Sequence, residues 1–127
     1  MIDKRATFWF VVALSYAGFI TYISSQPQLP TQDLGIDLGD KVMHVGAYFV
    51  FGIFWYKAFA AIKTNMRIPV IWIVFVYGMI FAAIDEFHQY FVPNREMEFL
   101  DFAADVLGIA LAIILVRLWN VQLRKAI

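Results

Sequence analysis

The chain has 127 residues, of which 62% are hydrophobic, 18% aromatic and only 16% charged, and its ten bases and ten acids give a formal net charge of zero. Such a composition excludes an ordinary water-soluble domain, because too little polar surface is available to cover it. Cysteine is absent, which excludes disulfides, thiolate catalysis and thiolate metal ligation.

Four stretches of the sequence are nearly free of charge and predict membrane-spanning helices. Extended by flanking residues to about 20, each is long enough to cross a hydrocarbon core about 30 Å thick. We therefore predict an all-α fold, an integral membrane four-helix bundle in which residues 1–127 form a single transmembrane domain. The predicted spans cover approximately residues 6–24, 41–62, 68–91 and 99–120.

The first span follows Met-Ile-Asp-Lys-Arg, which is similar to the charged start of a cleavable signal peptide. However, no small-x-small cleavage site follows the apolar run, since Tyr22 would lie three residues before a cut after Ser24. We expect this segment to be retained as a membrane helix.

The connections carry turn and helix-start signals. Residues 24–39 form a loop rich in proline and glycine, after which Asp40 is expected to cap the second span. Pro69 suits the first turn of the third span, where its missing N–H needs no partner. Pro93 and Asn94 break the chain between the third and fourth spans.

The charges are sorted between the two ends of the predicted bundle. Eight of the ten bases lie in the two terminal segments and in the connection near residues 57–67, and only Lys41 and Arg95 lie at the other end. That other end carries nine of the ten acids. Because basic segments stay on the cytoplasmic side, we predict that both termini are cytoplasmic.

Polar residues gather at the opposite, external end of three spans. The second span opens with polar residues three and four apart, the third ends in carboxylates and an amide, and the fourth opens with two aspartates four apart. Residues at these spacings share one helix face. We predict one ligand-binding cluster formed by Asp40, Lys41, His44, Tyr48, Asp85, Glu86, Gln89, Arg95, Asp101 and Asp105.

The fourth span also carries a stripe of small residues, Ala104, Gly108 and Ala112, which lets helix backbones approach closely in lipid. We expect this span to be the packed centre of the bundle, with Asp101 and Asp105 facing inward.

An ionisable group at the depth of Asp105 costs about 2.5 to 3.5 kcal/mol unless it is paired or solvated. The external cations available as partners are Lys41 and Arg95, and an arginine can hold a carboxylate through two parallel hydrogen bonds.

Simpler interpretations exist for several of these residues. Asp40 and Lys41 are also typical of residues that anchor a helix end at the membrane interface. His44 is also typical of a hydrogen-bonded packing residue. Glu96 and Glu98 fit a solvated rim. We interpret the aromatic excess as lipid-facing surface and interfacial belt rather than as a cofactor site.

Two segments, Asp40 to Tyr48 and Asp85 to Gly108, resemble the VanZ-like membrane protein family. The family pattern is Asp-Lys-x-x-His-x-x-x-Tyr, then Asp-Glu-x-x-Gln with Pro-Gly-Arg, then Asp-x-x-x-Asn-x-x-Gly, and the resemblance covers roughly residues 38–116. Asn94 replaces the usual glycine and tolerates the same left-handed backbone, whereas Asp105 replaces an asparagine and cannot donate a hydrogen bond when ionised.

The resemblance implies a multi-pass protein of the bacterial inner (cell) membrane with a role in the cell envelope. The family takes its name from a protein linked to low-level resistance to the glycopeptide antibiotic teicoplanin. The resemblance supplies no reaction.

Our first functional hypothesis is a non-enzymatic protein whose cluster binds a lipid-linked headgroup, an antibiotic or a partner protein, or which serves as a small subunit of a membrane complex. Lys41 and Arg95 would hold an anionic group. We expect the lipid bilayer and other membrane proteins as partners, no nucleic acid, and neither a cofactor nor a metal.

The alternative is a membrane-embedded enzyme that acts on a lipid or polyprenyl phosphate at the outer leaflet. Asp85 or Glu86 would be the general base and His44 an acid or base, with the two cations stabilising phosphoryl charge. A divalent metal among Asp85, Glu86, Asp101 and His44 is a variant that no recognised ligand spacing supports. Ion translocation is disfavoured, because the inner halves of the spans offer no polar relay.

Overall fold

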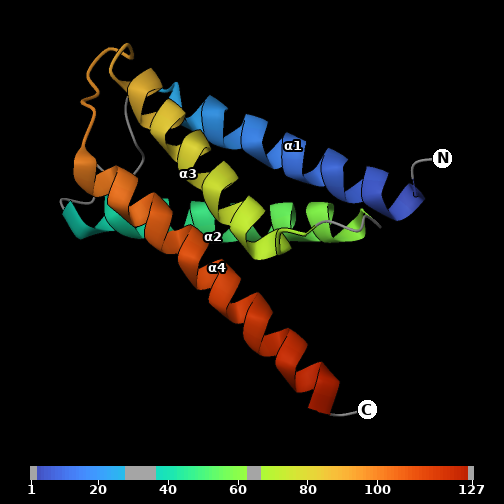
Figure 1. Ribbon diagram of the computed structural model, residues 1–127. Helices are drawn as coiled ribbons and strands as arrows, with labels where there is room; N and C mark the ends of the chain where they lie inside the picture. Colours follow the sequence, from blue (N-terminus) through green and yellow to red (C-terminus); the bar gives the residue numbers. More distant parts are fainter. Residues whose placement is uncertain (1–2, 28–36, 63–66, 126–127) are drawn as a thin grey trace.

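A computed structural model of the chain describes residues 3–27, 37–62 and 67–125, and all regular secondary structure within these ranges is helical. It contains four helices: α1 (Lys4–Ser24), α2 (Asp37–Ala61), α3 (Val70–Gln89) and α4 (Phe99–Lys125) (Figure 1). All four are long and apolar enough to cross a membrane. The predicted all-α four-helix bundle is therefore confirmed.

The helix starts differ from those predicted. α2 begins at Asp37, so Asp40 lies inside its first turn and does not cap the helix. Aspartate is compatible with this position, because the helix dipole stabilises negative charge in the first turn. Pro69 directly precedes α3 instead of lying in its first turn. The predicted loop 24–39 falls largely on residues 28–36, which lie outside the described residues.

The second helix, not the fourth, is the centre of the bundle. α2 packs more extensively against the other helices than any other described helix does, above all against α4, whereas α4 does not contact α1. The small stripe does face the bundle, as expected, because Ala104 and Ala112 are buried on α4. A side chain on Gly108 would collide with the α2 backbone, where a Cβ atom would lie 2.9 Å from Phe49 N.

Aromatic residues form much of the core between α2 and α3. The rings of Phe51 and Phe81 stack with centroids 4.8 Å apart, and those of Trp55 and Tyr77 lie 4.4 Å apart. Phe51 and Trp55 are buried. The expectation that the aromatic excess is mainly lipid-facing is thus wrong for this group, because large flat rings also fill the space between helices.

The two ends of the bundle are formed by different helix ends. Figure 1 shows both chain termini at one end, together with the end of α2 and the start of α3. The ends of α1 and α3 and the starts of α2 and α4 meet at the opposite end. Four helices that run alternately up and down the bundle place both termini at one end. The predicted site residues come together at the other end.

Candidate functional site

All ten predicted site residues lie in the described part of the chain and meet at this end of the bundle, where Ser24 and Glu98 join them. We call these twelve residues the polar cluster. Eight of them are at least nine-tenths buried, namely Ser24, His44, Tyr48, Asp85, Glu86, Gln89, Asp101 and Asp105. Burial of so many ionisable groups requires specific partners.

Two pairs of ionisable side chains connect α2 to α4. Lys41 Nζ donates to an oxygen of Asp101 and, at 2.6 Å, to Glu98 Oε2. About one turn deeper, His44 Nδ1 lies 2.8 Å from Asp105 Oδ1. The matching spacing on the two helices places the pairs one above the other. Glu98 is half-exposed at the rim, as expected, but it also pairs with Lys41.

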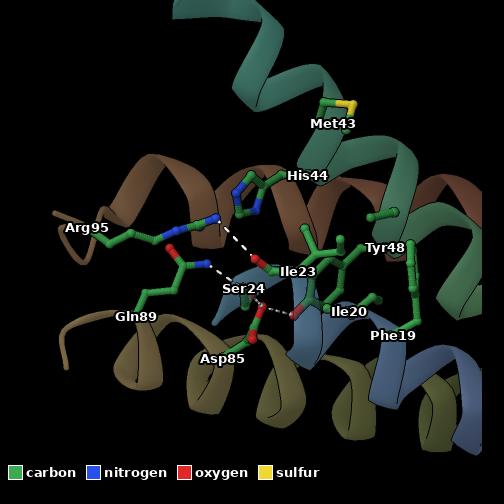
Figure 2. A pocket seen from close by; sticks show the side chains of 11 residues that line it. Phe19, Ile20, Ile23, Ser24, Met43, His44, Tyr48, Asp85, Gln89 and Arg95 are labelled. Atoms are coloured by element: carbon green, nitrogen blue, oxygen red, sulfur yellow. Dashed lines mark hydrogen bonds between the residues drawn. The ribbon is translucent and has the colours of Figure 1, made fainter. Parts of the chain in front are cut away.

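A second set of contacts joins α1, α2 and α3 around Asp85. Its Oδ2 atom accepts hydrogen bonds from Ser24 Oγ at 2.7 Å and from Tyr48 OH at 3.1 Å (Figure 2). Gln89 Nε2 donates to Ser24 Oγ at 3.2 Å. Sequence reasoning missed Ser24. Its only signal was its place at the outer end of the first span, level with the other polar groups.

Arg95 contacts backbone oxygens and not a carboxylate. Its Nη2 donates to Ile23 O at 3.3 Å (Figure 2). Its Nε donates to Gln26 O at 2.9 Å, so the side chain caps the C-terminal end of α1. The expected ion pair between Arg95 and a carboxylate is absent among the described residues. The carbonyls that end a helix are free acceptors and attract the cation instead.

Glu86 connects α3 to the turn before α4. Its Oε2 accepts a hydrogen bond from Glu98 N at 3.2 Å. Its other oxygen, Oε1, is buried and has no hydrogen-bond partner among the described residues, and the same holds for Asp105 Oδ2 and Asp40 Oδ1.

Two hollows adjoin the polar cluster, and both are lined by Gln89 and Arg95. The first, of about 170 Å³, has apolar walls from α1 and α2, and we call it the apolar groove; Figure 2 shows its lining residues. The second, of about 490 Å³, is the polar cavity. The groove walls include Phe19, Ile20, Ile23, Met43 and Ala47, and the rest of the cavity lining is Asp40, Asn94, Glu96, Glu98 and Asp101.

The cross-helix contacts explain the order of the polar motif in the sequence. Its lysine, histidine and tyrosine on α2 reach Asp101, Asp105 and Asp85 respectively. A family model described as VanZ/LLP1 matches residues 4–120, nearly the whole chain. The chain belongs to this family. No curated protein and no solved structure matches the chain.

As a member of the VanZ/LLP1 family, the chain is a membrane protein with four apolar helices. The turn between α3 and α4 accounts for one departure from the VanZ-like pattern. Asn94 has a φ of 62°, the left-handed conformation that glycine adopts without strain and that asparagine tolerates better than most residues. The other departure, Asp105, is the fully buried partner of His44.

Proposed function

We propose that this protein is a non-enzymatic binding protein of the bacterial inner membrane, and that it holds a lipid-linked molecule at the external end of the bundle. The headgroup occupies the polar cavity and the start of its chain occupies the apolar groove. The observation that carries the proposal is that Gln89 and Arg95 line both hollows, so one amphipathic ligand can occupy the two together.

The walls of the two hollows differ in the way that such a ligand needs. The groove between α1 and α2 is walled by side chains such as Phe19, Ile20 and Met43, which suit a hydrocarbon chain. The cavity is lined by four carboxylates, two amides and the Arg95 guanidinium, so most of its lining groups can accept hydrogen bonds from a ligand.

The charges in the cavity favour a headgroup that bears amino or hydroxyl groups. Asp40, Glu96 and Asp101 line the cavity, whereas Lys41 already pairs with Asp101 and Arg95 already caps α1. A bare phosphate would meet this negative lining without a free cation to hold it. Sugars or peptides with free amines supply the complementary charge.

The positive-inside distribution supports an external position for the cavity. Lipid-linked precursors of the cell envelope expose their headgroups at that surface. A role in the cell envelope, and the teicoplanin resistance that the family resemblance implies, would follow from binding such a headgroup.

The test uses a substitution that narrows the groove and replaces no residue of the polar cluster. In Ala47→Phe a large ring enters the groove, whereas in the matched control Ala83→Phe the same change is made at an exposed position on α3. We expect lipid-linked molecules that co-purify with the protein in native-membrane discs to fall at least fivefold in Ala47→Phe and to stay unchanged in Ala83→Phe, as measured by mass spectrometry. Equal amounts in both variants would refute the proposal.

The second candidate is the enzyme acting on a lipid or polyprenyl phosphate, and the observation that favours it is the His44–Asp105 pair at 2.8 Å, an arrangement that can orient a general base. Glu86→Gln and Arg95→Lys, made separately, discriminate between the two. Altered lipid products with an intact assembly would support catalysis, and unchanged products with loss of a co-purified partner would support binding.

A further inference from the structure

The polar cluster contains more carboxyl groups than permanent cations. Its two permanent cations are Lys41, which is engaged by Asp101 and Glu98, and Arg95, which donates to backbone carbonyls. Asp85 receives only neutral hydroxyl donors. The carboxylates of the cluster are Asp40, Asp85, Glu86, Glu98, Asp101 and Asp105.

Three of these carboxylates have an oxygen that no described group satisfies, and two of the three, Glu86 and Asp105, are almost completely buried. Glu86 is 3% exposed and Asp105 is 0% exposed. Glu86 Oε1 and Asp105 Oδ2 are buried without a hydrogen-bond partner among the described residues. Buried carboxylate oxygens that receive no hydrogen bond need a positive species beside them, either a proton or a metal ion.

We propose that His44, Glu86 and Asp105 form a binding site for one divalent cation. Each residue offers one ligand atom, and the three atoms lie within 4.8 Å of one another. One imidazole nitrogen and two carboxylate oxygens suit Zn²⁺ or Mn²⁺ better than Ca²⁺ or Mg²⁺, which prefer oxygen alone.

The surroundings hold the ligands in place. Glu98 N binds Glu86 Oε2, which fixes the carboxylate and leaves Oε1 for the ion. The ligands come from α2, α3 and α4, so an ion bound here would tie three helices together. Sequence reasoning had no spacing from which to expect the site, because no two of its ligands share a helix.

A neighbouring set, Asp40, His44 and Asp101, also brings three ligand atoms within 4.8 Å of one another. The ammonium group of Lys41 hydrogen-bonds to Asp101 and repels a second cation there. Asp40 is also only partly buried, with 26% of its side chain exposed. The deeper set has two unsatisfied oxygens against one in the shallower set, Asp40 Oδ1, and no lysine contacts it among the described residues. It is therefore preferred.

The experiment measures metal binding directly and involves no lipid ligand, so its outcome is independent of the proposed function. Untagged protein is purified in detergent, stripped with a chelator and titrated with Zn²⁺ or Mn²⁺ by calorimetry, with the bound metal counted by elemental analysis. We expect one ion per chain. Glu86→Gln and Asp105→Asn should each weaken binding at least tenfold.

Two control variants localise the site. Glu96→Gln removes an exposed carboxylate at the same end of the bundle and should change the affinity less than twofold. Asp40→Asn should also change the metal affinity less than twofold. A tenfold loss of metal affinity in Asp40→Asn alone would overturn the proposal in favour of the shallower set.

Folding of the metal-free variants is checked by circular dichroism. Asp105→Asn is expected to fold, because asparagine keeps an oxygen for His44 and has nearly the same shape. Should either variant fail to fold, the visible spectrum of Co²⁺ added to the unchanged protein tests for nitrogen and oxygen ligation. Absence of a one-to-one complex in the unchanged protein would overturn the proposal and leave protons as the species that satisfy the two oxygens.

Discussion

At the scale of single residues, three polar side chains of α2, Lys41, His44 and Tyr48, each pair with an aspartate on another helix. Tyr48 illustrates the effect, because it is 1% exposed and its hydroxyl reaches Asp85 on α3. In lipid, where the hydrophobic effect does not drive helices together, such hydrogen bonds and close packing supply the association energy.

Removal of that hydroxyl tests its contribution. Tyr48→Phe should lower the free energy of unfolding by about 0.6 to 1.7 kcal/mol, the range of interhelical hydrogen bonds in a membrane protein. The measurement is denaturant-driven unfolding in mixed micelles. Tyr22→Phe is the control, because Tyr22 is 63% exposed on α1. An equal effect in both variants would mean that Ser24 alone holds Asp85.

At the scale of helices, the contact between α2 and α4 depends on the absence of side chains at two glycines. A Cβ atom on Gly52 would lie 2.8 Å from Ala112 Cβ, and one on Gly108 would lie within 3.0 Å of α2 backbone atoms. Backbone cannot rotate away as a flexible side chain can. A methyl group on Gly108 must therefore push the helices apart and strain the pairs that Lys41 and His44 form with α4.

Gly108→Ala should therefore lower the free energy of unfolding by about 1 to 3 kcal/mol, the usual cost of overpacking. The matched control is Gly46→Ala on α2, where an added Cβ atom meets nothing within 4 Å. That substitution should be neutral or should stabilise by up to about 1 kcal/mol, because alanine favours the helix. A destabilised Gly46→Ala would show that helix propensity does not govern that position. An unchanged Gly108→Ala would contradict the close contact.

At the scale of the whole molecule, the charge distribution predicts the orientation in the membrane, with both termini on the cytoplasmic side. The chain has no cysteine, so single cysteines can report on sidedness. Met97→Cys lies in the α3–α4 connection and Ile68→Cys just before α3, and both positions are exposed. Neither substitution alters a charge.

We expect a membrane-impermeant maleimide to label Met97→Cys in intact cells and Ile68→Cys only after the membrane is opened. Labelling in the reverse order would place the polar cluster on the cytoplasmic side. Labelling of both in intact cells would contradict a hairpin topology.

Much of this architecture could be predicted from the sequence, because hydropathy fixes the spans and residues three and four apart share a face. The spacing of Lys41 and His44 correctly predicts that they lie on one side of α2. It cannot predict that Arg95 turns to the end of α1, because backbone carbonyls at a helix end leave no mark in the sequence. The small stripe around Gly108 indicates which face packs closely, but not that α2 is the helix at the centre.

The pairing of α2 with α4 has a consequence for how the protein is made. The ribosome delivers α2 before α4, so Lys41 and His44 enter the translocation machinery long before Asp101 and Asp105 are synthesised. Until the last helix arrives, these side chains are held by water, lipid headgroups or the insertion apparatus. Lys41 and His44 therefore find their carboxylate partners only when the chain is complete. In a product truncated before α4 both residues would lack these partners, and membrane quality-control proteases could recognise them.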